Sequence, residues 1–164
     1  MGWFWPRDSQ LFAPSRLPCW AIQNDDENLD YGMPVLPGHP GAKAARHSPG
    51  IEVDPDHVDR SVGDVDRAEI CDVIQRRTYQ TESALLALRI CLYEMSPDRH
   101  FIIDSGNRSP KYLPPHVTIA AGFSGHGFKF ASVIGEVLAD LSMTGRTQWP
   151  IEFFGLQRFV TGPG

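Results

Sequence analysis

The chain has 164 residues, of which 41% are hydrophobic, and its formal net charge is −5 at pH 7. These values are typical of a soluble globular protein with one ordinary core, and they argue against disorder of the whole chain. Acidic and basic residues are interspersed, without a basic stripe that could neutralise nucleic acid or an anionic membrane surface. No apolar run reaches the length of a membrane span, and residues 1–10 lack the apolar centre of a signal peptide, so we expect a cytoplasmic protein.

The three cysteines, Cys19, Cys71 and Cys91, lie far apart in the sequence and form no Cys-x-x-Cys pair. An odd number of widely spaced cysteines indicates neither a disulfide framework nor a zinc site. We therefore expect no bound metal, and at most one of these cysteines needs a special explanation.

The first part of the chain has the pattern of a short hairpin. Cys19–Gln23 and Leu29–Pro34 are candidate strands, and the polar run 24–28 between them favours a turn. Pro and Gly crowd residues 34–55, which disfavours regular structure except in the short piece Ala42–His47. We expect a loop-rich surface there.

A helix is predicted over Asp64–Tyr79. Its apolar residues recur at roughly helical spacing, and Asp64 or Asp66 near its start suits the positive end of the helix dipole. The following segment, Ala84–Tyr93, is apolar enough to be buried, but its periodicity does not decide between helix and strand.

Two strands separated by a loop are predicted in the last third of the chain. Phe101–Asp104 is a short strand candidate, and the Gly- and Pro-rich run Ser105–Pro115 is a loop. Val117–Ala121 has the continuous apolar pattern of a buried strand.

A Gly-rich turn, residues 122–127, leads into a helix predicted from about Phe128 to Met143 and ended by Gly145. Strand, Gly-rich turn and helix in this order form half of a Rossmann-type unit. The turn would aim backbone N–H groups and the helix dipole at an anion, although a plain surface turn explains the same residues. Because one strand and one helix cannot cover both faces of a parallel sheet, the pattern is that of a piece of a larger protein.

Several motifs occur in order along the chain: residues 2–4 (Gly-Trp-Phe), residues 31–34 (Tyr-Gly-Met-Pro), Lys43 with His47, residues 91–93 (Cys-Leu-Tyr), residues 96–98 (Ser-Pro-Asp), residues 101–104 (Phe-Ile-Ile-Asp) and residues 120–130 (Ala-Ala-Gly-Phe-Ser-Gly-His-Gly-Phe-Lys-Phe). In this order and separation they resemble the monomeric sarcosine oxidases and the related N-methyltryptophan and pipecolate oxidases. The resemblance extends from about Trp3 to Phe159.

This resemblance implies an α/β fold of mixed type, the C-terminal portion of a two-domain flavoprotein. Residues 1–98 would be part of the sheet-rich substrate domain, and residues 99–164 the C-terminal part of the Rossmann-type FAD-binding domain. The sequence contains no Gly-x-Gly-x-x-Gly motif for the dinucleotide. We expect the chain to be a fragment whose partner is the missing N-terminal half of the enzyme.

The implied reaction is the FAD-dependent oxidation of the C–N bond of a secondary amino acid, sarcosine or an N-methyl amino acid, by oxygen, with hydrogen peroxide as a product. Cys91 stands where the family attaches FAD covalently, although a free cysteine is usually a small buried hydrophobic residue. Lys129 matches the lysine that holds the substrate carboxylate. Lys43 matches the lysine that activates oxygen, a task for a fixed positive charge.

The resemblance also implies further pocket residues. Tyr31, His47 and Tyr93 match positions that orient the substrate or line the cavity, although each could instead be a packed aromatic ring or a buried histidine. The implied cofactor-binding positions in the Gly-rich turn and the helix after it are Gly125, His126, Gly127 and Lys129.

Two other functions fit parts of the sequence. A non-catalytic remnant that binds a partner chain would have the same sequence. A cysteine hydrolase could use Cys91 with a histidine, but no nucleophile signature surrounds that cysteine.

Overall fold

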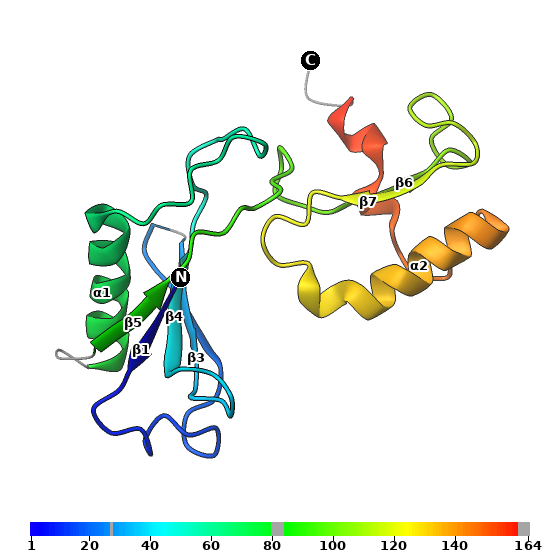
Figure 1. Cartoon of the computed structure of the whole chain (residues 1–164). Helices are drawn as coiled ribbons and strands as arrows, with labels where there is room; N and C mark the ends of the chain where they lie inside the picture. Colours follow the sequence, from blue (N-terminus) through cyan, green and yellow to red (C-terminus); the bar gives the residue numbers. More distant parts are fainter. Residues whose placement is uncertain (27, 80–83, 161–164) are drawn as a thin grey trace. The chain divides into compact units, whose positions relative to one another are not determined.

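A computed structural model of the chain describes residues 1–26, 28–79 and 84–160 and divides the chain into two compact units, Met1–Leu92 and Tyr93–Gly164. Both units combine helices with an antiparallel sheet (Figure 1), which confirms the mixed α/β class. Within these ranges, no helix has the length and apolar character that crossing a membrane requires. The same ranges contain no cluster of side chains suited to holding a metal ion.

In its described residues, the first unit is a five-stranded antiparallel sheet with one helix. The strand order is β2-β3-β4-β1-β5. The elements are β1 (Gly2–Trp5), β2 (Trp20–Gln23), β3 (Leu29–Met33), β4 (Ala42–His47), α1 (Asp64–Thr78) and β5 (Ala84–Leu88).

Most of these elements agree with the sequence-based predictions. The hairpin is confirmed as β2 and β3, and the predicted helix is confirmed as α1, which ends where Tyr79 adopts a left-handed backbone with φ 56°. The ambiguous segment after residue 83 proves to be the strand β5, which pairs with β1. The sequence pattern did not predict β1, whose aromatic residues show no alternation between polar and apolar side chains.

The core of the first unit lies between one face of the sheet and α1. Ala42 and Ala44 on β4 are buried and small, so α1 can pack closely against the middle of the sheet. The buried apolar cluster consists of Phe4, Phe12, Ala42, Ala44, Ile70, Val73, Ile74 and Leu88. Because successive side chains of a strand point to opposite faces, the odd-numbered residues of β4 must lie on the other face.

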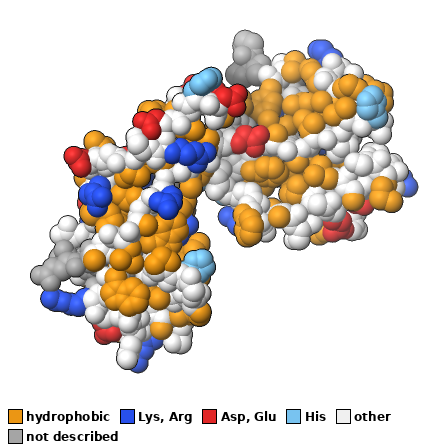
Figure 2. All heavy atoms as spheres, in the orientation of Figure 1, with side chains coloured by type: hydrophobic (Ala, Val, Ile, Leu, Met, Phe, Trp, Pro, Cys, Tyr) orange, Lys and Arg blue, Asp and Glu red, His pale blue; other side chains and the backbone are white. Residues whose placement is uncertain are grey.

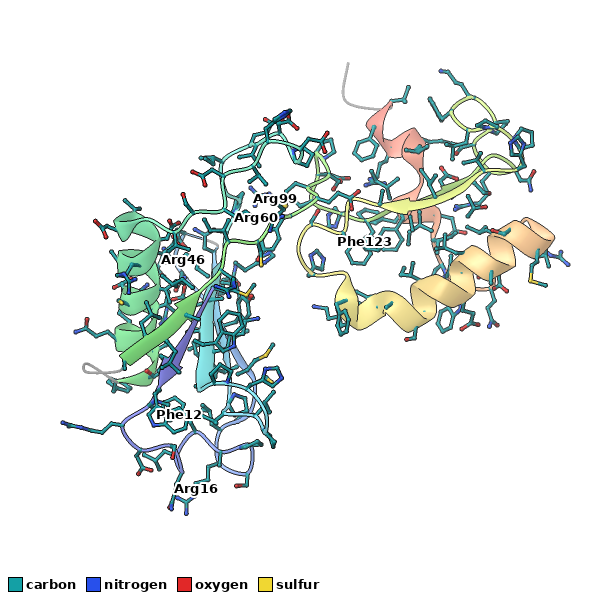
Figure 3. All side chains as sticks on the ribbon, in the orientation of Figure 1. Phe12, Arg16, Arg46, Arg60, Arg99 and Phe123 are labelled. Carbon is teal, nitrogen blue, oxygen red and sulfur yellow. The ribbon has the colours of Figure 1, made fainter. Side chains whose placement is uncertain are left out.

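A buried carboxylate joins the sheet to the helix. Asp30 on β3 is 0% exposed and accepts hydrogen bonds from Arg46 Nε of β4 at 3.2 Å and from Arg77 Nε of α1 at 2.9 Å. Arg76 of α1 adds an ion pair at 3.6 Å. Figure 3 labels Arg46 in this cluster. Burial alone raises the pKa of Asp30, but the hydrogen bonds from Arg77 and Arg46 outweigh it and hold this pKa below its ordinary value.

Up to residue 160, the second unit has a two-stranded antiparallel sheet and one long helix. Its elements are β6 (Ile102–Ser105), β7 (Thr118–Ala121), the 3-10 turn η1 (Phe128–Phe130), α2 (Ala131–Thr144), η2 (Glu152–Phe154) and η3 (Leu156–Phe159). Its buried apolar cluster consists of Phe101, Ile103, Val137, Leu141 and Ile151. Gly145 ends α2 with φ 73°, as predicted, and its N–H donates to the carbonyl of Leu141.

Two predictions for this unit need correction. The α-helix begins at Ala131 rather than near Phe128, because residues 128–130 form a tighter 3-10 turn. The residues of β7 are half-buried rather than fully buried, because the sheet of this unit, as described, consists of β6 and β7 alone. Figure 2 shows apolar side chains over much of the visible surface, and Phe128 is 96% exposed.

We predict that Asp30→Asn destabilises the first unit. The substitution removes the charge that three arginines share, and breaking such a buried pair costs about 3 kcal/mol. Because the folded-state pKa of Asp30 lies below the unfolded value of roughly 3.9, the wild-type contribution is present above that pH and is lost as the pH falls through the folded pKa. Urea unfolding from about pH 3 to pH 7 should therefore show a shallower pH dependence for the variant.

The matched control for this substitution is Asp25→Asn, because Asp25 is exposed. Stability of the Asp30 variant equal to that of the control across the pH range would show that the arginine cluster contributes nothing to the fold.

Candidate functional site

A lysine lies between two aromatic rings on the face of the sheet opposite α1. Lys43 Nζ is 5.7 Å from the centroid of the Trp3 ring and 5.6 Å from the centroid of the Tyr31 ring. The strand register causes this arrangement, since Trp3 of β1 is the direct cross-strand partner of Lys43, while Tyr31 lies on the neighbouring strand β3. Cation–π attraction to both rings holds the ammonium group over the sheet.

His47 belongs to the same face. It is four residues after Lys43 on β4, so the alternation of side chains directs both to one side. Met33 is the cross-strand partner of Lys43 on β3. We call these half-buried residues the Lys43 face: Trp3, Tyr31, Met33, Lys43 and His47. The structure thus brings together three of the predicted site residues, and Trp3 joins them.

Trp3 was not among the residues assigned a role from the sequence. The signal that could have found it is the strand β1, which places Trp3 opposite Lys43. Recognising β1 as a strand would have made Trp3 a candidate, and its pairing register with β4 is what places the ring beside Lys43.

Cys91 is exposed in this chain. It follows β5, where the chain runs beside its own first residue: Arg89 N–H donates to the carbonyl of Met1 at 2.9 Å, and Cys91 Sγ lies 3.9 Å from Met1 Sδ. An exposed thiol is accessible to an incoming group. Cys19 and Cys71 are exposed as well, so accessibility alone does not single out Cys91.

The Gly-rich turn of the second unit has an unusual backbone. Gly122, Ser124 and Gly125 all adopt positive φ angles, of 63°, 50° and 79°. Gly127 is required for a different reason: a Cβ there would lie 2.7 Å from the side chain of Phe123, which Figure 3 labels on this turn. The turn is therefore built for glycine at three of its six positions.

The ring of His126 is held on both sides. Its Nδ1 lies 3.1 Å from the carbonyl oxygen of Ser124, and the ring packs against Phe101 with 4.9 Å between centroids. A carbonyl oxygen can only accept a hydrogen bond, so this contact is a hydrogen bond in the tautomer that carries the proton on Nδ1. In the neutral ring Nε2 is then the accepting nitrogen.

Lys129 and Tyr93 lie in the same unit as this turn. Lys129 is exposed on η1, with its Nζ 5.4 Å from the centroid of the neighbouring Phe130 ring. Because α2 begins only at Ala131, its first turn lies beyond the Gly-rich turn, which corrects the expectation that the two adjoin. Tyr93 is half-buried at the start of the unit.

Comparison with known proteins gives a consistent result. Residues 5–141 match the family model described as "FAD dependent oxidoreductase" (DAO). The chain is 37% identical to a monomeric sarcosine oxidase of Streptomyces avermitilis, over 99% of this chain and 42% of that protein. It is 36% identical to a monomeric sarcosine oxidase of Bacillus sp. strain NS-129, over 96% of this chain and 40% of that protein.

A shorter match concerns another oxidase. The chain is 44% identical to an N-methyl-L-tryptophan oxidase of Escherichia coli O157:H7 over 71 residues, which are 42% of this chain and 17% of that protein. The chain spans about two fifths of the length of the curated sarcosine oxidases that it matches over nearly its whole length.

We predict that Gly127→Ala destabilises the second unit by about 1–3 kcal/mol, because the added methyl group overlaps the packed side chain of Phe123. Gly135→Ala is the matched control. Gly135 lies on α2, and a Cβ there would meet open space, so alanine should stabilise the helix by roughly 0.5–1 kcal/mol. Denaturant unfolding of both variants measures the two effects, and equal shifts in one direction would contradict the packing argument.

Proposed function

The chain belongs to the family of FAD-dependent oxidoreductases, and from this premise we propose that it forms part of an oxidase acting on a secondary amino acid. The substrate would be sarcosine or an N-methyl amino acid, whose C–N bond is oxidised while oxygen is reduced to hydrogen peroxide. Bound FAD would supply the redox chemistry that links oxidation of the substrate to reduction of oxygen. The proposal draws support from the names of the similar proteins and from the Lys43 face.

The observation that carries the proposal is the position of Lys43 between Trp3 and Tyr31. Attraction to two rings favours this position of the ammonium group, which places a positive charge where negative charge would develop in the reaction. We assign Lys43 to the activation of oxygen. A lysine in free solvent would need to reorganise to provide the same stabilisation.

The residues of this chain fit the flavin ring of FAD but not its pyrophosphate. The exposed thiol of Cys91 can form a covalent bond, and the rings of the Lys43 face offer an apolar surface to a flavin. The sequence has no Gly-x-Gly-x-x-Gly motif to hold the pyrophosphate. We propose that Cys91 attaches the flavin through a C–S bond that replaces its S–H bond and a C–H bond of a flavin methyl group, with the two electrons released passing to oxygen. We also propose that an N-terminal segment, within the part of the relatives' length that this chain does not span, binds the remainder of the dinucleotide.

The second unit supplies its own candidates. We propose that Lys129 binds the substrate carboxylate, because an exposed ammonium group can pair with it directly. The Gly-rich turn presents Gly125, His126 and Gly127 toward the cofactor in this proposal. Three residues of this turn have positive φ angles, and such an unusual backbone supports a role in binding rather than a plain surface turn.

The remaining assignments concern substrate orientation and domain organisation. We propose that Tyr31, His47 and Tyr93 orient the substrate. We also propose that residues 1–98 are part of the substrate domain and residues 99–164 part of the FAD domain. This boundary is close in sequence to the division between the two compact units, which falls after Leu92. The assembled enzyme is proposed to act in the cytoplasm.

The proposal is tested by joining this chain to the N-terminal half of the Streptomyces avermitilis relative and measuring hydrogen peroxide release with sarcosine. In this enzyme, Lys43→Met should slow reoxidation of the reduced flavin by about 10²–10³-fold, because one pre-organised charge is lost. Anaerobic reduction by sarcosine should change much less. Stopped-flow absorbance separates the two half-reactions.

Lys129→Met is the matched control, since it should raise the substrate concentration needed for half-maximal reduction and leave reoxidation unchanged. Reoxidation of the Lys43 variant at the parent rate would remove Lys43 from oxygen activation.

We predict that Cys91→Ala releases the flavin from the joined enzyme. The parent should keep its flavin through acid precipitation, because a thioether survives unfolding, whereas the variant should lose it to the supernatant. Cys19→Ala and Cys71→Ala are matched controls, as both thiols are also exposed. Flavin retained in the Cys91 variant and lost in either control would reassign the attachment site.

A further inference from the structure

Ser124 is a serine where the backbone favours glycine. Its φ angle is 50°, in the left-handed region that a residue with a Cβ adopts at a cost, and its side chain is 2% exposed. Its neighbours Gly122 and Gly125 already supply glycine to the same turn. A buried serine that accepts this conformation needs a compensating interaction.

The compensation comes from three hydrogen bonds. Ser124 N–H donates to the carbonyl of Glu94 at 2.9 Å, and Ser124 Oγ donates to the carbonyl of Gly122 at 3.0 Å. The same oxygen accepts the N–H of Ser96 at 3.4 Å. Two of these bonds join the Gly-rich turn to residues 94–96, far away in the sequence, and the third closes the turn on itself.

Residues 96–100, which follow the start of the segment that the turn contacts, are held in place by further hydrogen bonds. Ser96 Oγ donates to the carbonyl of His100 at 2.7 Å. Asp98 accepts two hydrogen bonds from Arg158, from Nε at 2.6 Å and from Nη2 at 3.1 Å. Arg158 also donates to the carbonyl of Phe154 at 2.8 Å. The Arg158 guanidinium holds the pKa of Asp98 well below its usual range, so the ion pair persists at neutral pH.

These contacts form a chain from the C-terminal part of the second unit to the Gly-rich turn. Arg158 fixes Asp98, the 96–100 loop fixes Ser96, and Ser96 reaches Ser124. The carbonyl of Ser124 then accepts the Nδ1 proton of His126. The last residue before this anchored segment is Tyr93, a proposed site residue.

We propose that Ser124 is a positioning residue, whose hydroxyl fixes the Gly-rich turn against residues 94–96 and thereby sets the orientation of His126. The inference rests on the proposed function for the role of the turn in facing the cofactor. The hydrogen bonds that connect residues 94–96, Ser124 and His126 do not depend on the proposed function, because they lie within this chain.

A simpler explanation is that residue 124 only has to adopt a positive φ. The two explanations predict opposite results for Ser124→Gly. Glycine adopts φ 50° more easily than serine, so the turn should be as well ordered or better ordered if backbone conformation is all that matters. If the hydroxyl is the tether, glycine should loosen the turn despite its easier backbone.

The test uses the whole chain without cofactor and compares Ser124→Gly and Ser124→Ala with the parent by NMR. Amide hydrogen exchange at Ser96, whose N–H donates to the hydroxyl, should become about tenfold faster in both variants. The ring nitrogen shifts of His126 should move from the Nδ1–H form of the parent toward a mixture of the two tautomers. Unchanged exchange at Ser96 together with an unchanged His126 tautomer in Ser124→Gly would overturn the proposal.

Two controls separate a local effect from unfolding. Exchange at the buried positions Val137 and Leu141 of α2 reports whether the unit stays folded, and these amides should keep their protection in both variants. Ser142→Ala removes an exposed serine hydroxyl from the same helix and should leave Ser96 and His126 as in the parent. Since none of these readouts requires a flavin, an inactive joined enzyme would count against the proposed function and not against the tether.

Discussion

Ala42 and Ala44 bring α1 close to the sheet, and this close approach decides where the chemistry of the first unit can lie. Side chains alternate along β4, so the residues between and after the two alanines must point away from the helix. Lys43 and His47 occupy such positions, and the register of β1 and β3 adds Trp3 and Tyr31 beside Lys43. The packing of one face thus determines which side chains the other face offers to a ligand.

In each unit an aspartate held by arginine joins segments that lie far apart in the sequence. Asp30 is fully buried and joins two strands to α1. Its buried charge interacts strongly with the arginines, and losing any of them would leave that charge poorly compensated. Asp98 is 34% exposed and joins its loop to the last helical turn through Arg158. Water screens this second pair, so its geometry matters more for the local arrangement than for the stability of the unit.

Local sequence patterns predicted the elements that depend on local interactions. The turn between β2 and β3, the periodicity of α1 and the glycine that ends α2 are all encoded within a few residues of each other. The strand β1 was missed because its place between β4 and β5 depends on distant pairing partners. The start of α2 was misplaced because 3-10 and α-helical turns share the same favourable residues.

The same distinction applies to the candidate site. The resemblance to sarcosine oxidases named Lys43, Tyr31 and His47, but their grouping on one face follows from the sheet register, which no local pattern contains. The tether at Ser124 could not be read from the sequence either, because a Gly-rich turn gives no sign of which distant backbone groups it will bond. The sequence therefore named the candidate residues, but only the fold shows which of their side chains lie together and which groups they bond.

The interior position of β1, between β4 and the edge strand β5, has a consequence for how the first unit assembles. Gly2 pairs with Ala44 on one side and with Leu88 on the other, so a strand from the beginning of the sequence closes the sheet only after both later strands are available. Pairings between such distant residues carry a large loop-closure entropy and slow the search for the native state. Until β5 arrives, the aromatic strand keeps one edge open to other chains. Refolding of the first unit should therefore depend steeply on protein concentration, with self-association competing against the final strand pairing.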